Sequence, residues 1–221
     1  MSAAARDAAR AGPTEPDRDC PRCPRLVAFR QANRAAAPDW FNAPVPTFGD
    51  PDARLLIVGL APGLKGANRT GRPFTGDYAG DLLYATLDKF GFSRGTYAAS
   101  PDDGLELVGA AIVNAVRCVP PQNKPLPAEI RTCLPFLVAT LDARPRIEAI
   151  LVLGKIAHDA TIAGFGGRPA HHKFAHGARH QLDGTPPIYD SYHCSRYNTN
   201  TGRLTAAMFE SVFSRIVADL R

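Results

Sequence analysis

The 221 residues suffice for one α/β domain with a full core, and 45% of them are hydrophobic, as is ordinary for a globular protein. Lys and Arg (26) exceed Asp and Glu (21), and this net charge of +5 is compatible with an anionic partner such as nucleic acid without establishing one. We find no apolar run that could span a membrane and no secretory signal, so we expect a protein of the reducing cytoplasm.

The predicted elements begin after a low-complexity stretch. Residues 1–18, rich in Ala, Arg and Pro, predict a flexible tail, and residues 19–221 form one predicted domain. A helix is expected over residues 24–36. Four apolar runs predict buried strands over residues 55–58, 111–115, 149–153 and 188–192. Further helices are expected over residues 77–90, 127–141, 154–163 and 204–220.

This alternation of buried strands and helices predicts a fold class. It favours a three-layer α/β/α fold with a central, mainly parallel four-stranded sheet. In such sheets ligands bind at the carboxyl ends of the strands. Most of the polar motifs described below follow the end of a predicted strand, which indicates a site along that edge.

Four of the five cysteines form a candidate metal site, namely Cys20, Cys23, Cys118 and Cys133. One close pair with two scattered cysteines is untypical of a zinc ribbon and favours a [4Fe–4S] cluster, although zinc and unliganded thiols remain alternatives. Such a site would tie the N-terminal segment to the domain, and a redox role is equally compatible with the pattern. We interpret Cys194 as a small buried residue.

The first strand end carries glycines and one acidic residue. Gly59 and Gly63 permit a close approach of backbone to ligand, but their spacing fits neither a phosphate-binding loop nor a dinucleotide fingerprint. Asp77 precedes a predicted helix and is a candidate N-cap. On the residues alone, Asp77 reads as a structural cap and Phe74 as a core residue.

Polar residues also follow two later strands. Asn114 among apolar neighbours needs partners for its amide, and a hydrogen bond between loops would provide them. His193 at the last strand end is, on its own, more often structural than catalytic. Arg196 and Tyr197 lie on the following polar loop, which is either simply solvated or able to contact phosphate and stack in a base gap.

Four of the six histidines fall within residues 171–180. Their spacing does not match the H-E-x-x-H metal motif, and no acidic residue lies among them. We therefore favour a basic loop that faces phosphate over a metal site.

Taken together, these motifs resemble a known family. GLAPG followed by TGRPFTGD, then NAVRCVPPQNKP and HCSRYNTNTGRLT, resemble the motifs of uracil-DNA glycosylases in their expected order. With CPRCPRL near the start, the chain is most similar to the iron–sulfur type, family 5, over about residues 18–221. Family 4 usually carries an acidic residue in a form like GEAPG, where this chain has Leu60 and Ala61.

The resemblance implies a DNA glycosylase that hydrolyses the bond between base and sugar in single- or double-stranded DNA. We expect a monomer that removes uracil and also hypoxanthine or other deaminated bases, because the small Ala61 leaves a roomier pocket. A uracil-specific enzyme of the family 4 kind and a non-enzymatic iron–sulfur DNA-binding protein are the alternatives.

The resemblance also implies a role for each candidate residue. It implies catalytic roles for Asp77, Asn114 and His193. It implies that the base-binding pocket is formed by Ala61, Gly63 and Phe74. It implies that Arg196 and Tyr197 contact DNA, and that a [4Fe–4S] cluster is held by Cys20, Cys23, Cys118 and Cys133.

Overall fold

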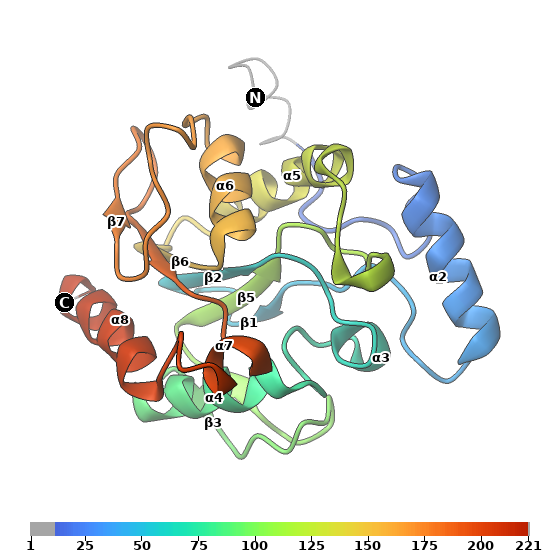
Figure 1. The fold of residues 1–221 in the computed structure, drawn as a ribbon, viewed down its shortest axis with the longest axis horizontal. Coiled ribbons are helices and arrows are strands. Elements are labelled where there is room, and N and C mark those ends of the chain that lie inside the picture. The colour runs from blue at the N-terminus through green and yellow to red at the C-terminus, as the bar shows by residue number, and fades with distance from the viewer. Residues whose placement is uncertain (1–11, 221) are drawn as a thin grey trace.

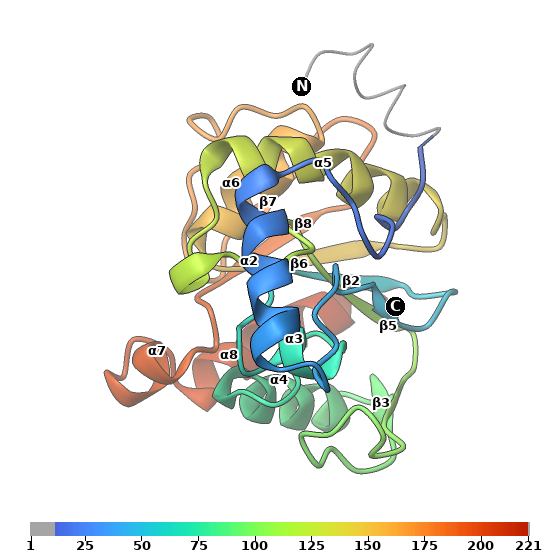
Figure 2. The same cartoon turned by 90° about the vertical axis from the view of Figure 1, so that its right-hand side faces the viewer.

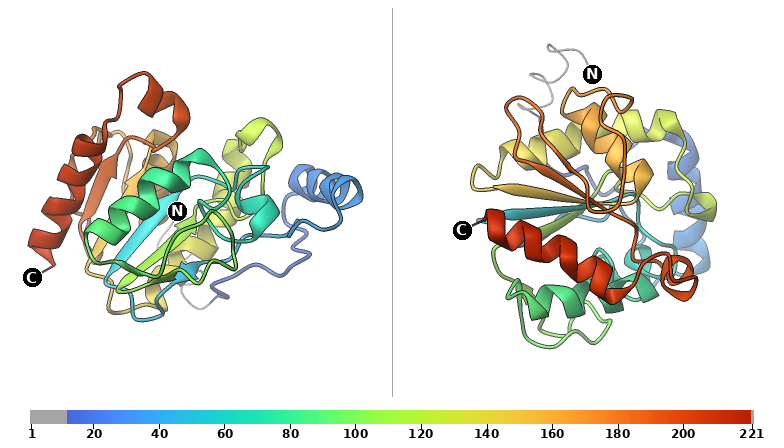
Figure 3. Two further views of the ribbon diagram at one scale, coloured as in Figure 1. Left: turned by 90° about the horizontal axis from the view of Figure 1, so that it is seen from below. Right: turned by 60° about the vertical axis from the view of Figure 1, so that its left-hand side comes forward.

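The computed structural model describes residues 12–220, which form three layers with a sheet between two sets of helices (Figure 1). Helices α5 (Pro127–Asp142) and α6 (Lys155–Gly164) cover one face of the sheet. Helices α4 (Tyr78–Lys89) and α8 (Ala206–Asp219) cover the other face (Figure 3). The predicted α/β/α architecture is therefore confirmed.

The central sheet has six strands in the order β1-β5-β2-β6-β8-β7. Its four inner strands pair in parallel and coincide with the four predicted apolar runs. They are β5 (Ala110–Asn114), β2 (Leu55–Gly59), β6 (Ala149–Leu153) and β8 (Ile188–Ser191).

The expectation of four strands missed both edges of this sheet. The edge strands β1 (Phe48–Gly49) and β7 (Arg179–His180) have two residues each and pair antiparallel with β5 and β8. Two residues are too few to show an alternating pattern, and none of these four residues is fully buried. The edges therefore left no apolar signal in the sequence.

The remaining elements lie around this frame. Helix α2 (Pro24–Ala36) lies at the same end of the domain as helix α3 (Ala67–Thr70) (Figure 2). The other short elements are a small hairpin of β3 (Ser93–Arg94) and β4 (Glu106–Leu107), the 3-10 turn η1 (Pro121–Asn123) and α7 (Arg196–Asn200). Within residues 12–220, no helix is long and apolar enough to cross a membrane.

Two hydrophobic cores lie on opposite faces of the sheet because successive strand side chains alternate. Leu55 and Ile57 of β2 pack in the core formed with α4 and α8. Leu56 and Val58 pack in the core formed with α5 and α6. All four are fully buried, so the frame beneath the strand ends is rigid.

Part of the predicted tail packs on the domain. Arg117 is fully buried, and its guanidinium donates hydrogen bonds to the Glu15 carboxylate at 2.8 Å and to the Thr14 carbonyl at 3.2 Å. Residues 14 and 15 are thus held against the end of β5, although residues 1–18 were all predicted to be flexible. Residues 1–11 lie outside the described residues.

Candidate active site

A cavity of about 300 Å³ opens at the carboxyl ends of β2, β5 and β8. Its size lies in the range of small-molecule pockets. Six of the residues predicted to form the site line it, namely Ala61, Gly63, Phe74, Asp77, Asn114 and His193. The other lining residues are Leu60, Pro62, Ala67, Asn123 and Ser195. The polar residues at separate strand ends thus converge on one hollow.

Asp77 caps helix α4 and faces the cavity. Its Oδ1 accepts a hydrogen bond from the Ala79 N–H at 3.2 Å, as the sequence predicted for an N-cap. Its Oδ2 lies so close to the glycine loop that a Cβ would sit 3.0 Å away at Gly63 and 2.4 Å away at Gly66. Burial raises the pKa of Asp77 above its ordinary value, although the N–H groups of Ala79 and Gly80 oppose this.

Phe74 and Asn114 meet above Gly59, the last residue of β2. A Cβ at Gly59 would lie 2.4 Å from Asn114 Oδ1 and 2.9 Å from the Phe74 ring, so only glycine allows this contact. Phe74 itself adopts a φ of 53°, which is costly for a bulky residue. The Tyr97 hydroxyl holds it by donating to its carbonyl at 3.2 Å.

His193 also lines the cavity that Asp77 faces. The centre of its ring lies 5.8 Å from the centre of the Phe74 ring, and the two rings stack with an angle of 28° between their planes. Burial lowers the pKa of His193 to about 4, so the ring is neutral near neutral pH. Among residues 12–220, no group hydrogen-bonds its ring nitrogens, whereas its carbonyl accepts from Asn198 Nδ2 at 2.8 Å. The ring therefore offers an unengaged N–H donor to whatever occupies the cavity.

Arg196 and Tyr197 lie on α7, next to the cavity residue Ser195, and do not line the cavity themselves. The side chain of Tyr197 is 72% exposed to solvent, which is unusual for a large aromatic residue and leaves its ring free to contact a partner. The Arg196 guanidinium lies 5.0 Å from the centre of the Tyr78 ring, which is also exposed. The structure thus places a cation and two aromatic rings next to the cavity residues Asp77 and Ser195.

Comparison with protein families matches residues 46–221 to the uracil DNA glycosylase superfamily. The chain belongs to the uracil DNA glycosylase superfamily. Two curated relatives are type-5 uracil-DNA glycosylases. That of Thermus thermophilus is 48% identical and matches 87% of this chain and 90% of its own length. That of Pyrobaculum aerophilum is 41% identical and matches 91% of this chain and 89% of its own length.

A type-4 relative shares a shorter region. The type-4 uracil-DNA glycosylase of Sulfurisphaera tokodaii is 36% identical over 113 residues, half of this chain. The type-5 relatives match most of the chain. This agrees with the expectation, based on the GLAPG motif, that the chain resembles family 5. The predicted superfamily membership is confirmed.

In this superfamily member, Asn123 is a cavity residue that the sequence did not single out. Gln122 and Asn123 both have a φ of 56°, in the left-handed region, within the turn η1. Asn is the more tolerant of the two in that conformation. The only signal in the sequence was an Asn inside a Pro-rich loop that follows a strand end. Two consecutive strained residues at a pocket are typical of a functional loop.

The four candidate cluster cysteines of this superfamily member line one pocket at the N-terminal end of α2. Apolar residues Leu26, Val116 and Phe136 surround them. Burial raises the pKa of Cys118 to about 11 and that of Cys133 to about 12. Cys194 lies apart from them in the core beside α4 and α8, as predicted.

Two N–H groups point at the sulfur atoms of this cysteine pocket. The backbone N–H of Arg117 donates to Cys133 Sγ at 3.4 Å. The guanidinium of Arg30, only 3% exposed, donates from Nη1 to Cys118 Sγ at 3.6 Å and from Nη2 to the Cys20 carbonyl at 3.1 Å. Its Nε is buried without a partner among the described residues. A buried cation with a spare donor suits a site that holds anionic sulfur.

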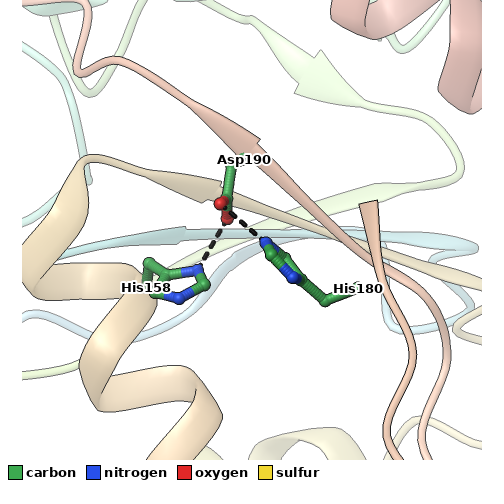
Figure 4. Close-up of side chains that lie close together, drawn as sticks. All are labelled: His158, His180 and Asp190. Atoms are coloured by element: carbon green, nitrogen blue, oxygen red, sulfur yellow. Dashed lines mark hydrogen bonds and ion pairs between the residues drawn. The ribbon is translucent and has the colours of Figure 1, made fainter. Parts of the chain in front are cut away.

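The histidine-rich segment joins a buried network behind β8 (Figure 4). Asp190 accepts from His158 Nδ1 at 2.7 Å and from His180 Nε2 at 2.8 Å. The other nitrogen of His158 faces the His172 carbonyl at 2.6 Å, so both ring nitrogens face acceptor atoms, which is the arrangement that a protonated ring satisfies. Burial alone would lower the pKa of His158, but Asp190 raises it above its ordinary value.

The distances between the side chains of His158, His180 and Asp190 are those of hydrogen bonds and are too short for ligands of one metal ion. Nitrogen and oxygen ligands about 2.0–2.1 Å from a tetrahedral metal would lie about 3.3 Å apart. The observed separations of 2.7 and 2.8 Å are ordinary for charge-assisted hydrogen bonds. We therefore interpret the group of His158, His180 and Asp190 as a structural network that fixes the segment against β8.

Proposed function

We propose that this protein removes uracil from DNA by hydrolysing the bond between the base and its sugar. The observation that supports this most directly is the convergence of Asp77, Asn114 and His193 around one cavity beside Phe74 in a member of this superfamily. The type-5 relatives carry that activity in their names. The excess of basic residues agrees with a DNA substrate.

The target base must leave the duplex to reach the cavity, because a cavity of about 300 Å³ is too small to hold stacked base pairs. Extrusion costs a few kcal/mol, and least for a mispaired base. In our proposal the extruded base stacks on Phe74 while backbone N–H groups near Ala61 and Gly63 meet its edge. Arg196 and Tyr197 contact phosphate and occupy the gap in the stack.

Cleavage of the glycosidic bond places negative charge on the departing base and positive charge on the sugar. We assign His193 as the donor to the base oxygen, since its neutral ring carries an unengaged N–H. We assign Asp77 to the sugar side, where its carboxylate orients a water molecule or stabilises the cation. Asn114 and Asn123 supply amides that orient the base or that water.

We further propose that the enzyme accepts hypoxanthine and other deaminated bases. The wall formed by Ala61, Gly63 and Ala67 has only small side chains, which leaves room for a purine ring. The test is alkaline cleavage of oligonucleotides that carry uracil, hypoxanthine or undamaged thymine, in single and double strands. We expect cleavage at uracil and hypoxanthine and none at thymine. Cleavage at uracil alone would favour a family 4-like specificity, and tight binding without cleavage would favour a non-enzymatic DNA-binding protein.

The pH dependence of base release tests the role of Asp77. Burial raises the Asp77 pKa, so the active carboxylate is lost as pH falls through that raised value, while His193 stays neutral down to about pH 4. We expect the single-turnover rate of the wild type to fall on the acidic side. Asp77→Asn should be slower at every pH and should lack this acid limb. An unchanged limb in Asp77→Asn would show that another group titrates.

We propose that Cys20, Cys23, Cys118 and Cys133 hold a [4Fe–4S] cluster. Four thiolates about 2.3 Å from one zinc ion would lie about 3.8 Å apart. Yet no three of these four sulfur atoms, all in the described part of the chain, lie within 4.8 Å of one another. A cluster suits the wider spread, because each thiolate binds a different iron. When bound, the cluster would join α2 to α5 and to the segment that follows β5. Cysteines that serve as metal ligands and not as disulfides are typical of a reducing compartment such as the cytoplasm.

Cys133→Ala tests this assignment, with Cys194→Ala as the matched control because both cysteines are buried. We expect purified wild type and Cys194→Ala to be brown, with broad visible absorption and iron bound to the protein. Cys133→Ala should lose the colour and most of its iron. Equal iron in all three proteins, or zinc in the wild type, would contradict the cluster.

A further inference from the structure

His176 contacts Tyr192, the residue that precedes the cavity residue His193. The Tyr192 backbone N–H donates to His176 Nδ1 at 3.2 Å. The two rings stack with centroids 5.1 Å apart and an angle of 15° between their planes. The Tyr192 ring also receives the Arg203 guanidinium at 4.7 Å. The backbone immediately before His193 is therefore fixed by a side chain from the histidine-rich segment.

Only one form of the His176 ring satisfies its contacts. Nδ1 accepts from the Tyr192 N–H, so it must carry a lone pair. Nε2 faces the Met208 carbonyl at 3.2 Å, so it must carry the proton. Burial lowers the pKa of His176 and keeps this neutral tautomer in place near neutral pH. The ring thus links the end of β8 to helix α8.

The loop that carries His176 is itself held against β8. Asp190 Oδ2 accepts from the Ala175 N–H at 3.2 Å, and the Asp190 carbonyl accepts from the Gly177 N–H at 2.9 Å. The same carboxylate is held by His158 and His180 (Figure 4). The loop on both sides of His176 is therefore tied to a residue only three positions before His193.

We propose that His176 is a positioning residue for His193, which acts by holding the Tyr192 backbone so that the His193 ring faces the cavity and Phe74. The inference rests on the proposed glycosylase function. It gives the histidine-rich segment a role in the reaction that needs no contact with DNA or metal. A donor displaced by about 1 Å can cost about 10²-fold in rate, so this support is worth a measurable part of the activity.

Asn and Gln substitutions separate the contacts of His176 Nδ1, with the Tyr192 N–H and with Ser191 Oγ at 3.4 Å, from the contact of Nε2 with Met208. Asn places its side-chain oxygen near the position of Nδ1 and keeps an acceptor for Tyr192, whereas Gln reaches the position of Nε2 and keeps only the contact with α8. We expect His176→Asn to keep a single-turnover rate within a few-fold of wild type on uracil-containing DNA. His176→Gln should be slower by about 10-fold to 10²-fold with an unchanged dissociation constant for DNA. The exposed Ser214 on α8 provides the control, and Ser214→Ala should equal wild type.

A double-mutant cycle decides whether His176 acts through His193. In a His193→Ala background, adding His176→Gln should cause no further loss, because the group being positioned is gone. The inference is overturned if His176→Gln equals wild type, if Asn and Gln lose equally, or if the Gln loss persists without His193. Should wild type release no base at all, the proposed function fails, which is distinct from these outcomes. Thermal unfolding of each variant separates a lost fold from a lost contact.

Discussion

His193→Ala is expected to slow base release from a uracil-containing oligonucleotide by about 10²–10³-fold under single-turnover conditions, the usual cost of removing one preorganised donor. The donor is effective because the ring is enclosed, neutral and not engaged elsewhere in the described chain. Its charge state does not change near neutral pH, so the loss should be of similar size across that range. Affinity for DNA should change little, since the contact strengthens only as charge develops on the base.

Two further variants sharpen this result. His193→Gln restores an N–H donor without the ring and should recover part of the rate. Ser214→Ala changes an exposed residue on α8 that lies outside the cavity and should have no effect. A near wild-type rate for His193→Ala would mean that another group meets the base oxygen, and Asn123 would be the first to test.

Asp103→Ala is expected to lower the free energy of unfolding by about 3 kcal/mol, because it leaves the charge of Arg72 buried and unpaired. The two side chains are only 5% and 2% exposed and share two hydrogen bonds of 2.7 Å. We choose the lower end of the usual range of about 3–5 kcal/mol because Asp103 belongs to a loop and not to a helix or strand. Arg72 also donates a hydrogen bond to the Thr75 hydroxyl. A shift of Arg72 after the loss of Asp103 should therefore disturb the turn that holds Phe74.

The same pair should make stability depend on pH. Arg72 holds the pKa of Asp103 well below its ordinary value. This stabilisation is complete above the unfolded value of about 3.9 and is lost as pH falls towards the folded one. Glu148→Ala is the matched control, because its partner Arg54 is 41% exposed and the pair should contribute about 0–1 kcal/mol. Equal shifts in the urea midpoints of the two variants would contradict this account.

The inner sheet could be predicted from the sequence because β2, β5 and β6 are largely apolar runs buried on both faces, whereas β8 contains the buried polar residues Asp190 and Ser191. The edge strands could not, since β1 and β7 are two-residue pairings set by their neighbours. The roles of Asp77, Asn114 and His193 were expected from the family resemblance, and the rule that parallel strands bring their carboxyl ends to one edge explains why Asn114 and His193 meet there. That rule says nothing about Asn123, which enters the cavity through an irregular turn with two left-handed residues.

The buried histidine network also lay beyond sequence reasoning. Its members come from α6, β7 and β8, and their pairing depends on how the segment between α6 and β8 folds back. A spacing motif detects ligands on one helix or one loop but not this arrangement. The cysteine pocket was predicted from the family resemblance, whereas the buried Arg30 at its wall became visible only in three dimensions.

The central claim is that the cavity beside Phe74 receives an extruded base. A crystal structure of the protein bound to duplex DNA with a non-hydrolysable uridine analogue tests it most directly. We predict the uracil ring stacked on Phe74, with a carbonyl oxygen within hydrogen-bonding distance of a His193 ring nitrogen and Asp77 on the sugar side. A uracil that remains in the duplex, or binds away from these three residues, would contradict the account.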